Sequence, residues 1–131
     1  MITTEIYNGS GPGDQLWMYL TTRYVAYKNG YDFGIGHPER WKLKNLNIDF
    51  GKSVFGGENV REGGPPITLP EGISKYYKEK HTYNDAYKDC NISDVDWDVF
   101  NVEDGTKLEG LFHYSILLEE NADLFKDWLD F

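Results

Sequence analysis

A turn with three glycines and a proline opens a long aromatic-rich segment near the start of this 131-residue chain, in Gly9-Ser10-Gly11-Pro12-Gly13-Asp14-Gln15. Glycine turns that begin a helix can bind phosphate through free backbone N–H groups and the positive end of the helix dipole. Here Pro12 has no N–H, and Asp14 places a negative charge at the dipole end. The dinucleotide fingerprint needs glycine at Asp14, and a P-loop needs Gly-Lys-Ser/Thr there. We therefore expect a tight strand-to-helix turn capped by Asp14, not an autonomous phosphate site.

The histidines and carboxylates do not form a recognisable metal or catalytic motif. His37, His81 and His113 are too far apart in the sequence for metal-ligand spacing, so we predict no metal site. The acidic run that begins at Asp94 lacks the glycine and glutamate of a calcium-binding loop. We assign no catalytic residue from the sequence. His113 is the exception of interest, because it follows a predicted strand, where polar side chains of open α/β sheets face the ligand crevice.

The elements that would position these residues are clearest in the first third of the chain. Met1–Tyr7 alternates loosely and is rich in β-branched residues, which predicts a strand. Asp14–Asn29 has apolar residues at helical spacing, and Asn29-Gly30 is a typical helix end. Tyr31–Gly36 predicts a second short strand. Strand, glycine turn, helix and strand together indicate a βαβ unit, and hence an α/β domain with a parallel sheet.

The later segments are less regular. Asn45–Phe55 alternates well enough for a strand or hairpin, and Gly56–Gly72 has so many glycines and prolines that we expect a long loop. Ser74–Asp89 is only loosely helical, and Lys107–Phe112 predicts the end of a strand. Leu117–Phe131 predicts an amphipathic helix with a wide apolar face.

Two adjacent apolar rows on that last helix are more than one sheet face can cover. We therefore expect Leu124, Trp128 and Phe131 to form an exposed patch. Such a patch predicts either a homo-oligomer or the docking of a missing second half.

Bulk composition limits the class of protein. At 15.2 kDa, one domain spanning residues 1–131 is expected. The net charge of −9, without a cluster of Lys or Arg, argues against a nucleic acid or an anionic membrane as partner. No apolar run approaches membrane-spanning length. The lone Cys90 fits a reducing compartment, so we expect a cytoplasmic protein.

One segment resembles a known family. Gly11-Pro12-Gly13-Asp14-Gln15-Leu16-Trp17-Met18-Tyr19 is similar to the G-x-G-N-Q-[LM]-[FW]-x-Y segment of α-1,2-fucosyltransferase-like glycosyltransferases. Leu108-Glu109-Gly110-Leu111-Phe112 resembles the segment that this family writes as L-x-G-[YF]-[FW]-Q. The stretch between them looks like the insert of viral and marine-microbial relatives. Asp14 stands where the family has Asn, and His113 stands where it has Gln.

The resemblance implies a fold and a ligand site. The fold would be a Rossmann-like βαβ half-domain, one half of a two-domain GT-B glycosyltransferase. The site residues carried over are Gly11, Gly13, Asp14, Gln15 and His113, as contacts to substrate. The family's H-x-R-x-G-D segment, associated with the nucleotide-sugar donor, is absent from this sequence. The chain thus resembles the N-terminal, acceptor-side half of such an enzyme, whose donor-binding half lies elsewhere.

Two functions remain open from the sequence. The first is the acceptor-side half of an enzyme that transfers a sugar, fucose by the resemblance, from a nucleotide sugar to a saccharide hydroxyl. GDP-fucose would then be a co-substrate of the complete enzyme, and no resident cofactor is expected. The second is a non-catalytic module that binds a saccharide or a protein and has kept the half-enzyme fold.

Overall fold

The computed structural model describes residues 1–59, 65–80 and 95–129. Its helices and strands are, in chain order, β1 (Ile2–Glu5), α1 (Pro12–Asn29), β2 (Phe33–Gly36), the short helix η1 (Pro38–Arg40), β3 (Gly56–Asn59), β4 (Pro66–Pro70), β5 (Lys75–Lys78), the short helix η3 (Trp97–Asn101), β6 (Thr106–Glu109), α3 (Ser115–Glu120) and α4 (Ala122–Trp128).

The main sheet is parallel. Its four strands follow the order β2-β1-β6-β5, and every neighbouring pair runs in the same direction. β1 and β2 pair with Ile2 opposite Phe33 and Glu5 opposite Gly36, and α1 joins them and packs on both. The expected βαβ unit is thereby confirmed. The architecture is mixed α/β and compatible with a Rossmann-like half-domain.

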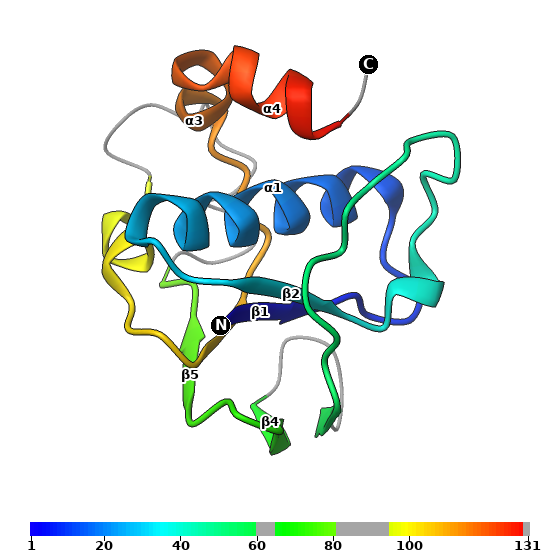
Figure 1. Ribbon diagram of the computed structural model, residues 1–131, viewed down its shortest axis with the longest axis vertical. Coiled ribbons are helices and arrows are strands. Elements are labelled where there is room, and N and C mark those ends of the chain that lie inside the picture. The colour runs from blue at the N-terminus through cyan, green and yellow to red at the C-terminus, as the bar shows by residue number, and fades with distance from the viewer. Residues whose placement is uncertain (60–64, 81–94, 130–131) are drawn as a thin grey trace.

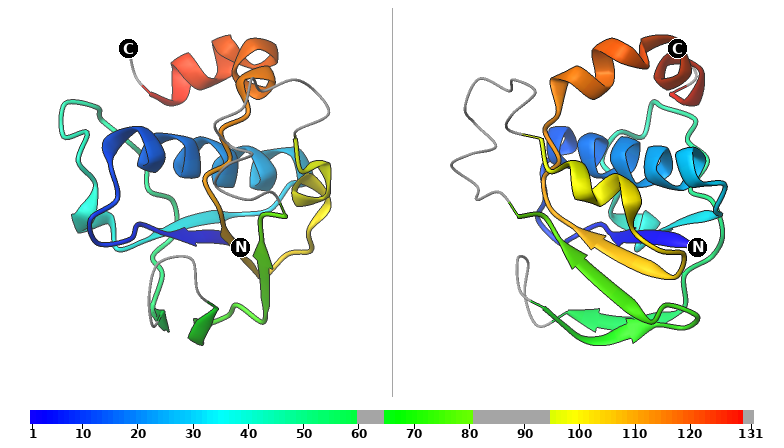
Figure 2. Two further views of the ribbon diagram at one scale, coloured as in Figure 1. Left: turned by 180° about the vertical axis from the view of Figure 1, so that it is seen from behind. Right: turned by 90° about the vertical axis from the view of Figure 1, so that its left-hand side faces the viewer.

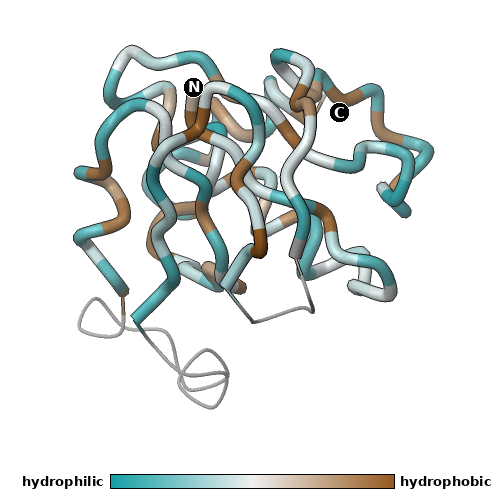
Figure 3. The backbone as a smooth tube through the Cα atoms, turned by 90° about the horizontal axis from the view of Figure 1, so that it is seen from below, coloured by the Kyte–Doolittle hydropathy of each residue, from teal (hydrophilic) through white to brown (hydrophobic). Residues whose placement is uncertain are grey.

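The elements lie in tiers (Figures 1 and 2). α1 covers one face of the sheet, and α3 and α4 lie beyond α1 on the same side. The hairpin of β3 and β4 lies beyond the opposite face. Hydrophobic positions are scattered along the backbone in short stretches between hydrophilic ones (Figure 3), as expected where each element buries only part of its surface. The core lies between the sheet and the helices and includes Ile2, Val25, Leu108, Phe112 and Phe125.

The two ends of α1 show one correct and one incorrect prediction. Gly30 ends the helix with a left-handed φ of 74°, and its N–H and that of Tyr31 close back on Tyr27 and Ala26. Asp14, however, is not the N-cap. Gly11 is the N-cap and Pro12 is the first helical residue, because its fixed φ already suits a helix start. Asp14 therefore lies inside the first turn.

The middle of the chain is more ordered than the sequence predicts. The expected loop Gly56–Gly72 contains β3 and β4, which pair antiparallel, with residues 60–64 outside the described part. Prolines can stand at 66 and 70 because they occupy strand ends, where fewer ladder N–H groups are needed. Asn45–Phe55 forms no strand or hairpin, only an isolated bridge from Gly51 to β2.

β5 begins within the segment that is only loosely helical by sequence, Ser74–Asp89, and residues 81–89 of that segment are not described. Residues 75–78 form a strand and not a helix, because the pairing of β5 with β6 overrides the weak helical spacing.

The exposed apolar patch expected on the last helix is not found in the described residues. That helix is broken at Asn121 into α3 and α4, which changes the direction of its apolar faces. Trp128 is only 8% exposed, stacks on Phe125 with ring centroids 5.3 Å apart, and lies against the guanidinium of Arg23. Leu124 is partly buried against the core, and Phe131 lies outside the described residues.

Candidate functional site

The sheet face that α1 does not cover is polar. Side chains alternate between the two faces of a strand, so Thr3 and Glu5 of β1 lie with Lys107 and Glu109 of β6 on the face opposite Ile2 and Leu108. All four of these polar residues are buried. Parallel sheets are normally apolar on both faces, and burying charge is costly without a partner. This face is therefore the part of the sheet least explained by packing.

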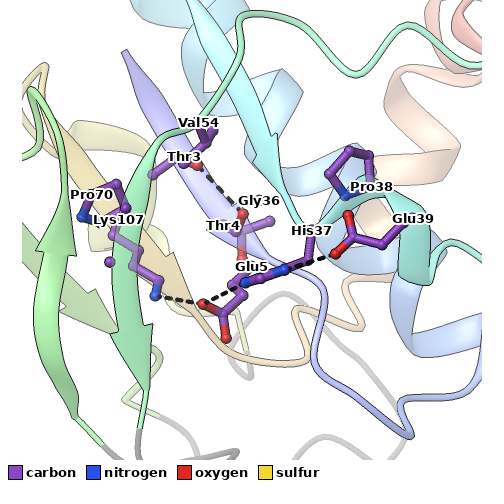
Figure 4. Close-up of a pocket in the computed structure, with 12 residues that line it drawn as sticks. Thr3, Thr4, Glu5, Gly36, His37, Pro38, Glu39, Val54, Pro70 and Lys107 are labelled. Carbon is purple, nitrogen blue, oxygen red and sulfur yellow. Dashed lines mark hydrogen bonds and ion pairs between the residues drawn. The ribbon is translucent and has the colours of Figure 1, made fainter.

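A cavity of about 260 Å³ opens on that face, toward the ends of β1 and β2 (Figure 4). Ligands of open α/β sheets bind in the crevice outside the carboxyl ends of the strands, which is where Glu5, Gly36 and His37 stand. The lining residues are Thr3, Thr4, Glu5, Gly36, His37, Pro38, Glu39, Val54, Gly56, Gly57, Pro70 and Lys107.

Acidic and basic groups alternate along the cavity. Lys107 Nζ lies 3.4 Å and His37 Nε2 lies 4.0 Å from the same oxygen of Glu5, Oε1. His37 Nδ1 lies 2.9 Å from Glu39 Oε1, and this hydrogen bond lowers the pKa of the Glu39 carboxyl. His37 has a left-handed φ of 56°. Residues other than glycine rarely adopt this backbone conformation. It persists where the surrounding structure imposes it, often at functional sites.

A second cluster contains residues that the sequence singles out. Asp14 Oδ1 and His113 Nε2 are 3.0 Å apart, although the two residues are 99 positions apart in the chain. Trp17, one turn along α1 from Asp14, places its ring 5.8 Å from the imidazole. Gly11 and Gly13 lie in the adjoining turn, with open space where a Cβ would stand. The structure thus brings four of the five predicted site residues to the start of α1.

Gln15, the fifth predicted residue, has a different environment. Its side chain is buried, and Nε2 donates to Ser10 and to the carbonyl of Arg40. Its Oε1 accepts from the N–H of Lys42 at 2.8 Å. Gln15 therefore connects the glycine turn to the segment around η1 through hydrogen bonds. Its role at the site is to position these two segments.

Buried carboxylates and tyrosines hold the loop that carries His113. Glu79 Oε1 accepts from the N–H groups of Leu111 and Phe112 at 3.1 and 3.4 Å, and Glu79 Oε2 accepts from the hydroxyl of Tyr114. Burial and the adjacent Glu79 raise the pKa of Tyr114. Phe112 has a left-handed φ of 53°, which these contacts hold in place.

A similar pair of bonds lies on the polar face of the sheet. Glu109 accepts hydrogen bonds from the hydroxyls of Tyr7, at 2.8 Å, and Tyr76. Burial, followed by the proximity of Glu109, raises the pKa of Tyr7. Glu109 is not among the residues that line the cavity.

Sequence reasoning missed the residues of the cavity and Trp17. The sequence did not single out His37 as a site residue, because its contact with Glu5 depends on how β1 and the segment before η1 meet. One sequence signal was available: Glu5 and Lys107 are charged residues inside predicted strands, where a buried parallel strand is usually apolar.

Comparison of this chain with known protein families and with solved structures finds no match to either. Across residues 1–59, 65–80 and 95–129, no group of three or more His, Cys, Asp or Glu side chains is arranged to hold a metal ion. In the same residues, no helix has the length and apolar character needed to span a membrane.

Proposed function

We propose that this chain is the saccharide-binding, acceptor-side half of a glycosyltransferase-like protein. The observation that carries the proposal is the contact of Asp14 with His113 at the carboxyl edge of a parallel sheet, beside the glycine turn. This edge is where open α/β folds bind ligands. Both residues were singled out by the resemblance to fucosyltransferase-like enzymes, and the resemblance did not require that they touch.

The chemistry of the cluster suits a hydroxylated ligand. Asp14 uses Oδ1 for His113, and among the described residues Oδ2 has no hydrogen-bond partner, so it can accept from a sugar hydroxyl. Trp17 adds an aromatic surface, and sites for small molecules combine such surfaces with a few convergent polar groups. In a complete enzyme, a carboxylate–imidazole pair of this kind would assist removal of the acceptor hydroxyl proton.

Transfer by this chain alone is not expected. A donor site must neutralise the nucleotide diphosphate with cationic groups or backbone donors, and the cationic donor motif of the family is absent from the sequence. The net charge of −9 also opposes the approach of an anionic donor. The alternative of a non-catalytic saccharide-binding module shares the same ligand site and differs only in needing no second half.

The test is saccharide binding followed by amide NMR. We expect a subset of a panel of monosaccharides and disaccharides to shift the amides of Gly11 and Gly13 and the indole of Trp17. Asp14→Asn should weaken that binding about tenfold or more, since hydrogen bonds to charged groups contribute about 1.5–3 kcal/mol. Asp123→Asn, an exposed change of the same kind on α4, is the matched control.

The outcomes separate the alternatives. No shift with any saccharide in the millimolar range would rule out the site. Turnover of GDP-fucose by the purified chain, lost in Asp14→Asn, would show that catalysis needs no second half. If the chain binds a saccharide but shows no turnover, and if no added donor-binding domain produces turnover, the function is that of a binding module.

A further inference from the structure

The cavity on the polar face contains a carboxylate oxygen to which no described residue donates a hydrogen bond. Glu5 is only 8% exposed, and both of its basic neighbours, Lys107 and His37, approach Oε1. Oε2 makes no hydrogen bond to any residue that the structure describes, and Figure 4 shows the two dashed contacts converging on the other oxygen. Among the described residues, the buried side-chain oxygens without a partner are those of Thr21 and Thr22, so Glu5 Oε2 is open to the cavity and can accept a hydrogen bond from a bound ligand.

The charges lining the cavity favour a cation. Glu5 and Glu39 contribute two carboxylates, and Lys107 is the single ammonium group among the lining residues. Two carboxylates against one ammonium group leave one excess negative charge among these groups, which one added positive charge would cancel. An anion would meet the two carboxylates and a protein of net charge −9, and would be repelled.

The size and the walls of the cavity favour an organic ion over a bare metal ion. Its volume of about 260 Å³ corresponds to roughly nine water molecules at about 30 Å³ each. Val54, Pro38 and Pro70 supply apolar surface for a carbon skeleton. The described side chains offer no cluster of three or more metal ligands.

We propose that this cavity binds a small organic ammonium ion, with Glu5 Oε2 and the carboxylate of Glu39 as its acceptors. Glu5 receives the ammonium at depth, where Lys107 holds its carboxylate in place through Oε1. Glu39, whose side chain is 68% exposed, stands at the rim and is oriented by His37. The lining includes neither Asp14 nor His113, so the proposal does not depend on the saccharide site.

Three probes of similar size test the charge requirement. Ethanolamine, ethylene glycol and acetate are titrated into the isotopically labelled chain, and amide shifts are followed at Gly36, His37 and Gly57. We expect saturable shifts with ethanolamine, shifts at least about tenfold weaker in affinity with the uncharged glycol, and none with acetate. Acetate or glycol binding as tightly as ethanolamine would overturn the proposal, as would no saturable binding of ethanolamine.

Variants locate the site. Glu5→Gln and Glu39→Gln should each weaken ethanolamine binding about tenfold, and Glu119→Gln, an exposed change on α3, should leave it unaltered. Glu5→Gln also disturbs the buried pair with Lys107, so its fold is checked by circular dichroism; if it unfolds, the exposed Glu39→Gln decides. Unchanged affinity in every folded variant would show that ethanolamine binds elsewhere and would refute the assignment.

Discussion

Removing the carboxylate of Glu79 should destabilise the protein and release the loop that carries His113. Glu79 is buried and accepts hydrogen bonds from two backbone N–H groups, of Leu111 and Phe112, and from the hydroxyl of Tyr114. Glu79→Ala leaves all three donors without that acceptor. The lost hydrogen bonds all belong to the loop that carries His113. Because His113 contacts Asp14, a change in this loop also alters that contact.

The magnitude follows from the burial of each donor. The Phe112 N–H and the Tyr114 hydroxyl belong to buried residues, and each unsatisfied buried donor costs about 1–3 kcal/mol. The N–H of Leu111 is partly exposed and can turn to water, so we add about 0.5 kcal/mol for it. Because the 3.4 Å bond to Phe112 is long, we take the lower half of its range. The sum is a loss of about 2.5–5.5 kcal/mol of unfolding free energy.

Urea denaturation followed by tryptophan fluorescence measures this loss. A domain of this size is expected to be stable by about 5–15 kcal/mol, so the change is large enough to resolve. Glu79→Gln keeps an oxygen for the two N–H groups and should cost about 1–2 kcal/mol. Glu103→Ala, an exposed carboxylate paired with Lys75, is the control and should cost less than about 1 kcal/mol.

The reasoning would be refuted by a loss of less than about 1 kcal/mol in Glu79→Ala, since that is no more than a surface pair contributes. It would also fail if the amide of Gly13 and the ring of His113 kept their chemical shifts in that variant. Either result would mean that the loop keeps its conformation without Glu79. A large loss with unchanged shifts would limit Glu79 to stability and remove its connection with the site.

Two further predictions concern stability. Burial raises the pKa of Tyr7 and of Tyr114 above the unfolded value of about 10, so the folded state retains protons that the unfolded chain releases. The contribution of these two tyrosines to the unfolding free energy is complete below about pH 10, and above it falls by about 1.4 kcal/mol per pH unit for each tyrosine. Denaturation at pH 9 to 11.5 measures this fall. If the unfolding free energy of Tyr7→Phe fell as steeply with pH as that of the unmodified chain, the prediction would be contradicted. Trp128→Ala should cost about 3 kcal/mol or more by removing a buried ring, whereas Leu118→Ala on the exposed surface should cost less than about 1 kcal/mol. A stable Trp128→Ala variant that changed only self-association in sedimentation would restore the exposed-patch interpretation.

Local patterns were sufficient to predict the first third of the fold. The local signals are the β-branched residues in β1, the helical spacing in α1 and the turn-forming Gly30. Each signal depends on the conformational preferences of residues close together in the sequence, and the tertiary contacts favour the same conformations. Patterns of this kind were insufficient at Gly56–Gly72, where composition predicts a loop. There the pairing of β3 with β4 supplies hydrogen bonds that no local signal encodes.

The candidate sites depend on tertiary structure. The sequence by itself determined the residue types, the charge of −9, the βαβ order and the position of Asp14 next to a helix start. Tertiary structure decided that Asp14 meets His113, that Trp128 is buried, and that Lys107 pairs with Glu5 across 102 positions. The physical reason is that periodicity reports which face of an element is apolar, whereas a pair of distant side chains meets only after strand order and loop path have been set by packing.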